Sequence, residues 1–116
     1  MANPKLETYR HFKRPGLMRR RVDVWLPAQY HAEPERKFPV LYMHDGQNAF
    51  TRSPYVGTGW MAHECIDTLA AEGKITPPVV VAISCTLNRI GDYLPQKALA
   101  YPGAVDYVKQ ITPRYF

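Results

Sequence analysis

Polar and flexible residues follow directly on an apolar run in this sequence: His44, Asp45, Gly46 and Gln47 come after FPVLYM at residues 38–43. A glycine that follows a buried strand lets the chain turn sharply and expose backbone N–H groups. Such groups at the Gly46–Gln47 peptide are suited to stabilising the oxyanion of acyl transfer, and Asp45 is suited to bonding a substrate hydroxyl. The other interpretation is a plain turn, in which Asp45 caps backbone amides and His44 packs against a neighbour.

Other reactive residue types lack the spacing that their chemistry needs. Ser84 and Cys85 end a second apolar run, but no serine in the chain has the flanking glycines of a G-x-S-x-G nucleophile turn. The pair His63-Glu64 lacks the second histidine of an H-E-x-x-H zinc site. We therefore expect no metal and no cofactor, and we assign no nucleophile.

Two kinds of strand are predicted around this turn. Residues 8–13 and 17–26 flank the turn signal Arg14-Pro15-Gly16 and predict an antiparallel hairpin. Residues 38–43 and 77–84 are continuous apolar runs, which predict strands with both faces buried in the centre of a parallel sheet.

A helix is predicted between the two apolar strands, over residues 59–72, with Thr58 as N-cap and Gly73 as its end. Its expected buried stripe has apolar residues at i, i+4 and i+8, with one more beside them: Met61, Cys65, Leu69 and Ile66. Strand, helix and strand then form a βαβ unit with parallel strands. The loops HDGQN and 84–89 should therefore meet at one edge of the sheet, where open α/β sheets bind ligands.

The remaining segments complete an α/β architecture. Residues 28–37 and 86–97 are predicted loops, and residues 103–111 open a last helix. We expect one domain over residues 1–116, because this length supplies one modest core. The predicted fold class is α/β, the first half of an open three-layer sheet with helices on its faces.

Composition limits the classes of partner. Hydrophobic residues make up 46% and charged residues 22%, as in ordinary globular proteins, and no apolar run is long enough for a membrane span. The net charge of +5 comes largely from basic clusters at 13–14 and 19–21, which favour a solvated strand edge over a nucleic-acid surface. We expect no nucleic acid and no membrane as partners. The missing secretory h-region and two reduced thiols, Cys65 and Cys85, favour a cytoplasmic location.

An ordered series of motifs resembles a known family. VDVWLPAQY, FPVLYMHDGQNAF, GWMAHECIDTLAAEGKITPPVVVAIS and NRIGDYLP together look like the amino-terminal half of the putative-esterase family of α/β-hydrolases. That group includes esterase D, the enterochelin esterases and the mycolyltransferases. The similarity covers residues 20–95, and VDYVKQITPRYF is similar to the helix that precedes the family's nucleophile strand.

The resemblance implies a serine hydrolase that acts on small carboxylic esters. It implies that Gln47 gives a backbone N–H to the oxyanion hole and that Gly46 permits the turn. Asp45 matches a position that contacts the alcohol portion of the substrate, and His44 beside it joins the candidate substrate-binding set. Trp60 matches an aromatic residue near the site. Two further residues match a loop over the same edge: Arg89 and Tyr93.

The chain also departs from the family pattern. The family's serine, acid and histidine come later along the chain, and none of the four histidines here occupies the catalytic position. We therefore expect little or no turnover by this chain alone. Without the nucleophile strand, the strand at 38–43 would keep an open apolar edge, which predicts association with itself or with a carboxyl-terminal half. Two alternatives are a non-catalytic ligand-binding domain and an interaction module that uses the basic hairpin.

Overall fold

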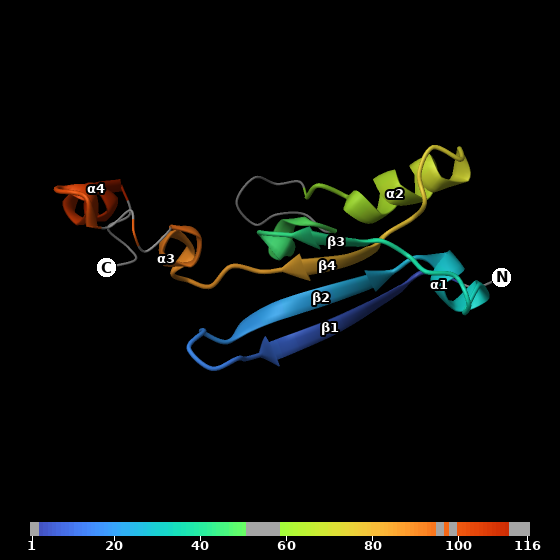
Figure 1. Ribbon diagram of the computed structural model, residues 1–116, viewed down its shortest axis with the longest axis horizontal. Coiled ribbons are helices and arrows are strands. Elements are labelled where there is room, and N and C mark those ends of the chain that lie inside the picture. Colours follow the sequence, from blue (N-terminus) through green and yellow to red (C-terminus); the bar gives the residue numbers. More distant parts are fainter. Residues whose placement is uncertain (1–2, 51–58, 95–96, 98–99, 112–116) are drawn as a thin grey trace. The chain divides into compact units, whose positions relative to one another are not determined.

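The computed structural model describes residues 3–50, 59–94, 97 and 100–111, and it divides into two compact units at Ser84/Cys85. The first unit holds a sheet with its flanking helices, and the described residues of the second include two α-helices (Figure 1). In chain order the elements are β1 Lys5–Phe12, β2 Arg20–Leu26, α1 Ala28–Ala32, β3 Val40–Met43, the 3-10 helix η1 Gly46–Asn48, α2 Ala62–Ala71, β4 Val79–Ile83, α3 Arg89–Tyr93 and α4 Ala104–Ile111.

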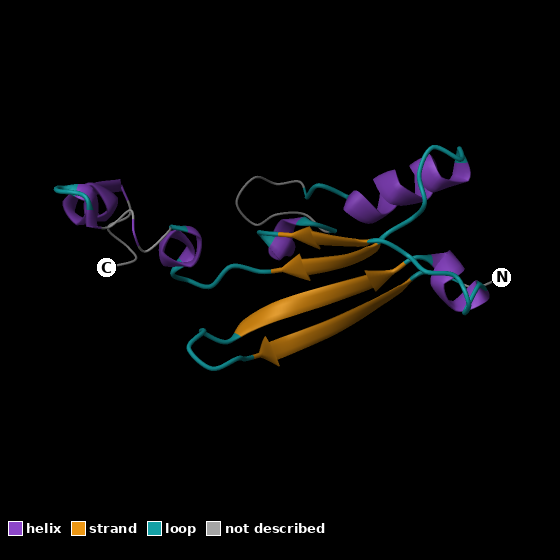
Figure 2. Cartoon of the chain, viewed as in Figure 1, coloured by secondary structure: helices purple, strands orange, loops and turns teal. Residues whose placement is uncertain are grey.

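The sheet of the described residues has the strand order β1-β2-β4-β3 (Figure 2). β1 pairs with β2 antiparallel, which confirms the predicted hairpin. β3 and β4 pair in parallel, with Val40 opposite Val79 and Met43 opposite Ala82. The predicted parallel βαβ unit is therefore confirmed, and the overall α/β class with it.

β3 is an edge strand, and the prediction that both of its faces are buried in the centre of the sheet was wrong. Its residues Val40, Leu41 and Tyr42 are 49%, 42% and 70% exposed. β4 holds the central position between β2 and β3, and its Val80 and Ala82 are fully buried. An apolar run indicates a strand that can be buried, but burial of its two faces also requires a layer packed on each face of the sheet.

The core lies on one face of the sheet, beneath α2. Trp25 of β2 and Val80 of β4 are paired across the sheet and pack with Ile66 of α2. The cluster is completed by side chains from the loop after β3 and from β4: Ala49, Phe50 and Ala82. Because strand residues alternate between faces, the residues between these positions point to the opposite face.

The buried stripe of α2 differs from the prediction. Ile66 is buried, whereas Cys65 and Leu69 are exposed, and Met61 is only half-buried. The helix begins at Ala62, after Met61 in a left-handed conformation with φ 51°. The predicted N-cap, Thr58, lies outside the described residues. The core selects the stripe that contains Ala62 and Ile66, which lies one residue, or about 100°, around the helix from the predicted one.

Two short helices lie in segments that were predicted to be loops. α1 occupies part of residues 28–37 and α3 part of residues 86–97. Each is five residues long, too short to repeat an apolar pattern that sequence reading would detect. The last predicted helix is confirmed as α4. In the part of the chain that the structure describes, no helix has the length and apolar character needed to cross a membrane.

Candidate functional site

The turn after β3 is built on a left-handed residue. Asp45 has φ 51° and ψ 45°, a conformation that aspartate tolerates better than most residues. The N–H of Asn48 donates to the carbonyl of Asp45 at 2.9 Å, and the N–H of Ala49 donates to that of Gly46 at 3.2 Å. The chain therefore reverses through Asp45 and enters a single 3-10 turn at Gly46.

Position 46 requires a glycine because the backbone of β4 approaches it closely, and not because its φ is positive. A Cβ at this position would collide with the carbonyl carbon of Ala82 and lie 2.5 Å from the nitrogen of Ile83. The turn after β3 is thus pressed against the backbone at the end of β4. The strand ends share one edge, as the parallel order predicts, and buried Ser84 follows at that edge.

The side chains of the turn contact one another. The Nε2 of Gln47 donates to Oδ1 of Asp45 at 3.2 Å. Asp45 makes no side-chain capping bond to η1. His44 is exposed at the end of β3. This contact joins the Asp45 and Gln47 side chains at the edge of the sheet.

Trp60 is positioned by the same turn. Its backbone N–H donates to the carbonyl of Asn48 at 2.7 Å, and the N–H of Ala62 donates to that of Ala49 at 2.9 Å. These bonds hold the start of α2 against the end of η1 and the residue after it. The Trp60 side chain is 51% exposed. Asn48 was not singled out from the sequence, because a backbone carbonyl leaves no signal in residue type.

Arg89 and Tyr93 lie together on α3, in the second unit. The Arg89 guanidinium carbon is 5.4 Å from the centroid of the Tyr93 ring, a cation–π distance. The N-cap of this helix is Asn88, whose Oδ1 accepts from the N–H of Gly91 at 3.3 Å. Oδ2 of Asp92 accepts from the backbone N–H and the hydroxyl of Thr86 at 2.7 and 2.8 Å. These bonds order the segment that carries both candidates.

The predicted site residues therefore form two groups. The turn brings together Asp45, Gly46 and Gln47, with the backbone of Trp60 bonded close by. Arg89 and Tyr93 form the second group. Sequence reading missed the residues that build this second group, Asn88 and Asp92. The available signal was the asparagine itself, a residue type preferred at the N-cap, but it is hard to detect when the helix has one turn.

The mixed sheet and its glycine turn define an α/β protein whose candidate ligand site lies at the carboxyl ends of parallel strands. A family model described as Putative esterase matches residues 18–112, so the chain belongs to this esterase family.

A solved structure of a ferulic acid esterase is similar to this chain, with a TM-score of 0.52 and 19% sequence identity. The alignment covers 96% of this chain and 44% of that one, so the chain spans less than half the length of that structure. At this identity the similarity concerns the fold. No curated protein matched the chain.

Proposed function

We propose that this chain supplies the oxyanion-stabilising part of a carboxylic ester hydrolase. The observation that carries the proposal is the seating of Gly46 against Ala82 and Ile83, which sets the turn after β3 at the shared carboxyl edge of two parallel strands. Membership of the esterase family supplies the chemistry expected at that edge.

In this proposal the backbone N–H of Gln47 faces the ester carbonyl. When a nucleophile adds to the carbonyl carbon, negative charge develops on the carbonyl oxygen, and a fixed N–H dipole stabilises that charge more than the neutral ground state. Asp45 and His44 contact the alcohol portion of the ester. Trp60, whose backbone is bonded to the end of the same turn, contacts the rest of the substrate.

The attacking serine comes from elsewhere in this proposal, because the sequence contains no G-x-S-x-G. The open edge of β3 is the place where the strand that carries the serine would pair. An oxyanion site without an attacking group has no covalent intermediate to stabilise. The chain alone is therefore expected to show no ester turnover.

The first test is hydrolysis of p-nitrophenyl acetate by the purified chain. We expect a rate equal to that of buffer and no labelling by a fluorophosphonate, which reacts with activated serines. Turnover above buffer that is accompanied by labelling of a serine in this chain would overturn the assignment of the nucleophile to another segment.

The second test addresses Gln47 in an assembly with the carboxyl-terminal segment that carries the nucleophile. Gln47→Pro removes the backbone N–H, and loss of one such donor lowers kcat by about 10²- to 10³-fold. Gln47→Ala is the matched control, because it removes the same side chain and its bond to Asp45 but retains the N–H. Equal loss in the two variants would show that the backbone amide has no role.

A non-catalytic ligand-binding domain is the second candidate, and the lack of a G-x-S-x-G motif favours it. It predicts that the assembly with a carboxyl-terminal segment stays inactive and unlabelled. The same assembly would still bind a non-hydrolysable ester analogue, and Trp60 fluorescence would report this binding.

A further inference from the structure

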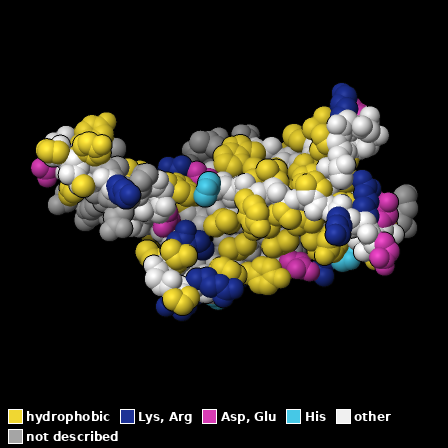
Figure 3. Space-filling view, viewed as in Figure 1, with side chains coloured by type: hydrophobic (Ala, Val, Ile, Leu, Met, Phe, Trp, Pro, Cys, Tyr) yellow, Lys and Arg dark blue, Asp and Glu magenta, His cyan; other side chains and the backbone are white. Residues whose placement is uncertain are grey.

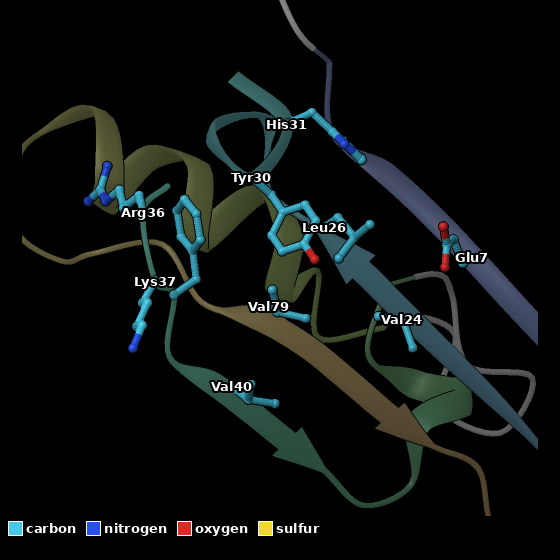
Figure 4. Close-up of a pocket in the computed structure, with 10 residues that line it drawn as sticks. Glu7, Val24, Leu26, Tyr30, His31, Arg36, Lys37, Val40 and Val79 are labelled. Atoms are coloured by element: carbon cyan, nitrogen blue, oxygen red, sulfur yellow. The ribbon is translucent and has the colours of Figure 1, made fainter. Parts of the chain in front are cut away.

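A cavity of about 650 Å³ lies at the other end of the sheet from the turn after β3 (Figure 4). Its floor consists of strand residues: Val24, Leu26, Val40 and Val79. Val40 and Val79 begin β3 and β4, whereas the turn at Gly46 follows their carboxyl ends. The cavity is therefore separate from the proposed ester site.

The register places this floor on the sheet face that α2 does not cover. Val24 lies opposite Val81, and Val40 lies opposite Val79, so these residues alternate with the core residues Trp25 and Val80. Figure 3 shows hydrophobic side chains gathered over the sheet in this view. The floor can thus accept an apolar body.

Aromatic side chains from α1 and from the segment before β3 form one wall. The ring centroids of Tyr30 and Phe38 are 5.8 Å apart, with 47° between the ring planes. The close-up shows the Tyr30 ring beside Leu26 (Figure 4). A flat ring or an alkyl chain can pack against such a wall, and the volume lies in the usual range for small-molecule sites.

The charges around the cavity favour an anion. Two cationic side chains, Arg36 and Lys37, line it against a single carboxylate from Glu7, and His31 adds a polar ring. Glu7 is already compensated, because it pairs with Lys5 at 3.3 Å and accepts from the hydroxyl of Tyr9 at 3.1 Å. The bond from Tyr9, and after it the bond from Lys5, lowers the pKa of Glu7. The cavity therefore keeps an excess of positive charge.

Lys37 is the lining cation that stays available to a ligand. Arg36 is engaged, since its Nη1 lies 2.9 Å from Oε2 of Glu33 and its guanidinium stacks over Phe38. Lys37 has no ion pair or hydrogen bond with any residue that the structure describes. The hydroxyl of Tyr30 likewise has no bond within the described residues. One ammonium donor and one hydroxyl donor suit a carboxylate.

We propose that this cavity binds a small organic monocarboxylate with an apolar ring or chain. The apolar body lies on Val24, Leu26, Val40 and Val79, and the carboxylate lies beside Lys37. Burial of apolar surface supplies most of the affinity, and the charge selects the anion over a neutral analogue.

The test compares 2-naphthoate with 2-naphthamide, which has a similar shape and no charge. Titrations of the purified chain followed by calorimetry should show tighter binding of 2-naphthoate. Added salt should weaken the binding of 2-naphthoate and leave the binding of 2-naphthamide unchanged, because only 2-naphthoate forms a charge pair with the protein. Equal affinities for the two compounds, or no binding of 2-naphthoate at millimolar concentration, would overturn the proposal.

Two variants locate the site. Lys37→Met keeps the length of the side chain and removes its charge, and should weaken 2-naphthoate binding roughly two- to fivefold, the range for a partly exposed pair. The control is Lys74→Met, at a lysine that pairs with Glu72 just after α2. It should leave the affinity for 2-naphthoate unchanged. Val40→Glu adds a repelling carboxylate and should weaken 2-naphthoate more than 2-naphthamide. If Lys37→Met and Lys74→Met act alike, or Val40→Glu affects both ligands equally, the cavity is not the site.

Discussion

At the scale of single residues, two neighbouring residues of the turn after β3 have separate roles. The sequence analysis assigned the chain reversal to the glycine alone. Asp45 takes the positive φ, and Gly46 provides the space for contact with β4. The sequence HDG suggests that glycine makes the reversal, because glycine adopts positive φ most easily. The second reason for a glycine, contact with a strand distant in the sequence, is visible only when the two strands are paired.

Gly46→Ala should be strongly destabilising. Its Cβ would meet backbone atoms of Ala82 and Ile83, which cannot move aside as a flexible side chain can. Overpacking of this kind costs about 1–3 kcal/mol, and rigid backbone neighbours place this case near the upper end. Urea denaturation followed by tryptophan fluorescence measures the change, since Trp25 lies in the core.

Gly73→Ala provides the comparison for that measurement. Gly73 has φ +72°, and a methyl group added there would meet no atom within 4 Å, so this substitution tests backbone strain without crowding. A left-handed alanine costs about 1–2 kcal/mol. If Gly46→Ala destabilises the chain no more than Gly73→Ala does, the turn is not seated on β4 as described.

At the scale of elements, α3 illustrates a helix held by its cap. It is one short turn, and its order rests on the acceptor of Asn88 and on the two bonds from Thr86 to Asp92. An isolated helix of this length is unstable in water, so side-chain bonds decide whether it forms. The same bonds set the spacing at which Arg89 meets Tyr93.

Asn88→Ala should therefore open α3 without affecting the sheet. Loss of an N-cap costs about 0.5–2 kcal/mol, and the lost bond is local, from residue 88 to Gly91. Hydrogen exchange measured by NMR should be faster at the amide of Gly91 and unchanged at the amides of β4. Asn88→Asp retains an acceptor oxygen and should exchange like the parent chain. Protection that survives in Asn88→Ala would contradict this role for the cap.

The elements that were predicted from the sequence are those with a pattern over several residues. The hairpin has a turn signal between its strands, the two apolar strands are continuous apolar runs, and α2 and α4 have apolar residues at helical spacing. α1 and α3 were missed because five residues cannot show a helical period. The stripe of α2 was misplaced because residues 61–70 offer adjacent apolar stripes, and only the shape of the sheet beneath selects between them. Within the candidate site, the turn after β3 was predictable from the sequence. The residues that position Trp60 and Arg89, which are Asn48, Asn88 and Asp92, were not.

At the scale of the whole molecule, the open edge of β3 is the feature with the largest consequence. Leu41 and Tyr42 remain exposed, and among the described residues β3 pairs only with β4. Natural edge strands carry charges or prolines that discourage pairing, but Val40–Met43 contains neither. We propose that this edge associates, either with a second copy of the chain or with a carboxyl-terminal half that supplies the next strand.

Tyr42→Lys should reduce this association. A lysine on an edge strand adds a charge that pairing would have to desolvate, and Tyr42 is 70% exposed, so the substitution disturbs no core contact. Light scattering over a range of concentrations should show a rising mass for the parent chain and a smaller rise for the variant. Tyr107→Lys, at a tyrosine that is 62% exposed on α4, adds the same charge away from the edge and should behave like the parent.

A parent chain that stays monomeric at high concentration would exclude self-association, and pairing with a carboxyl-terminal half would then be tested by adding that segment. If Tyr42→Lys binds that segment as tightly as the parent chain does, β3 is not the edge at which the two parts join.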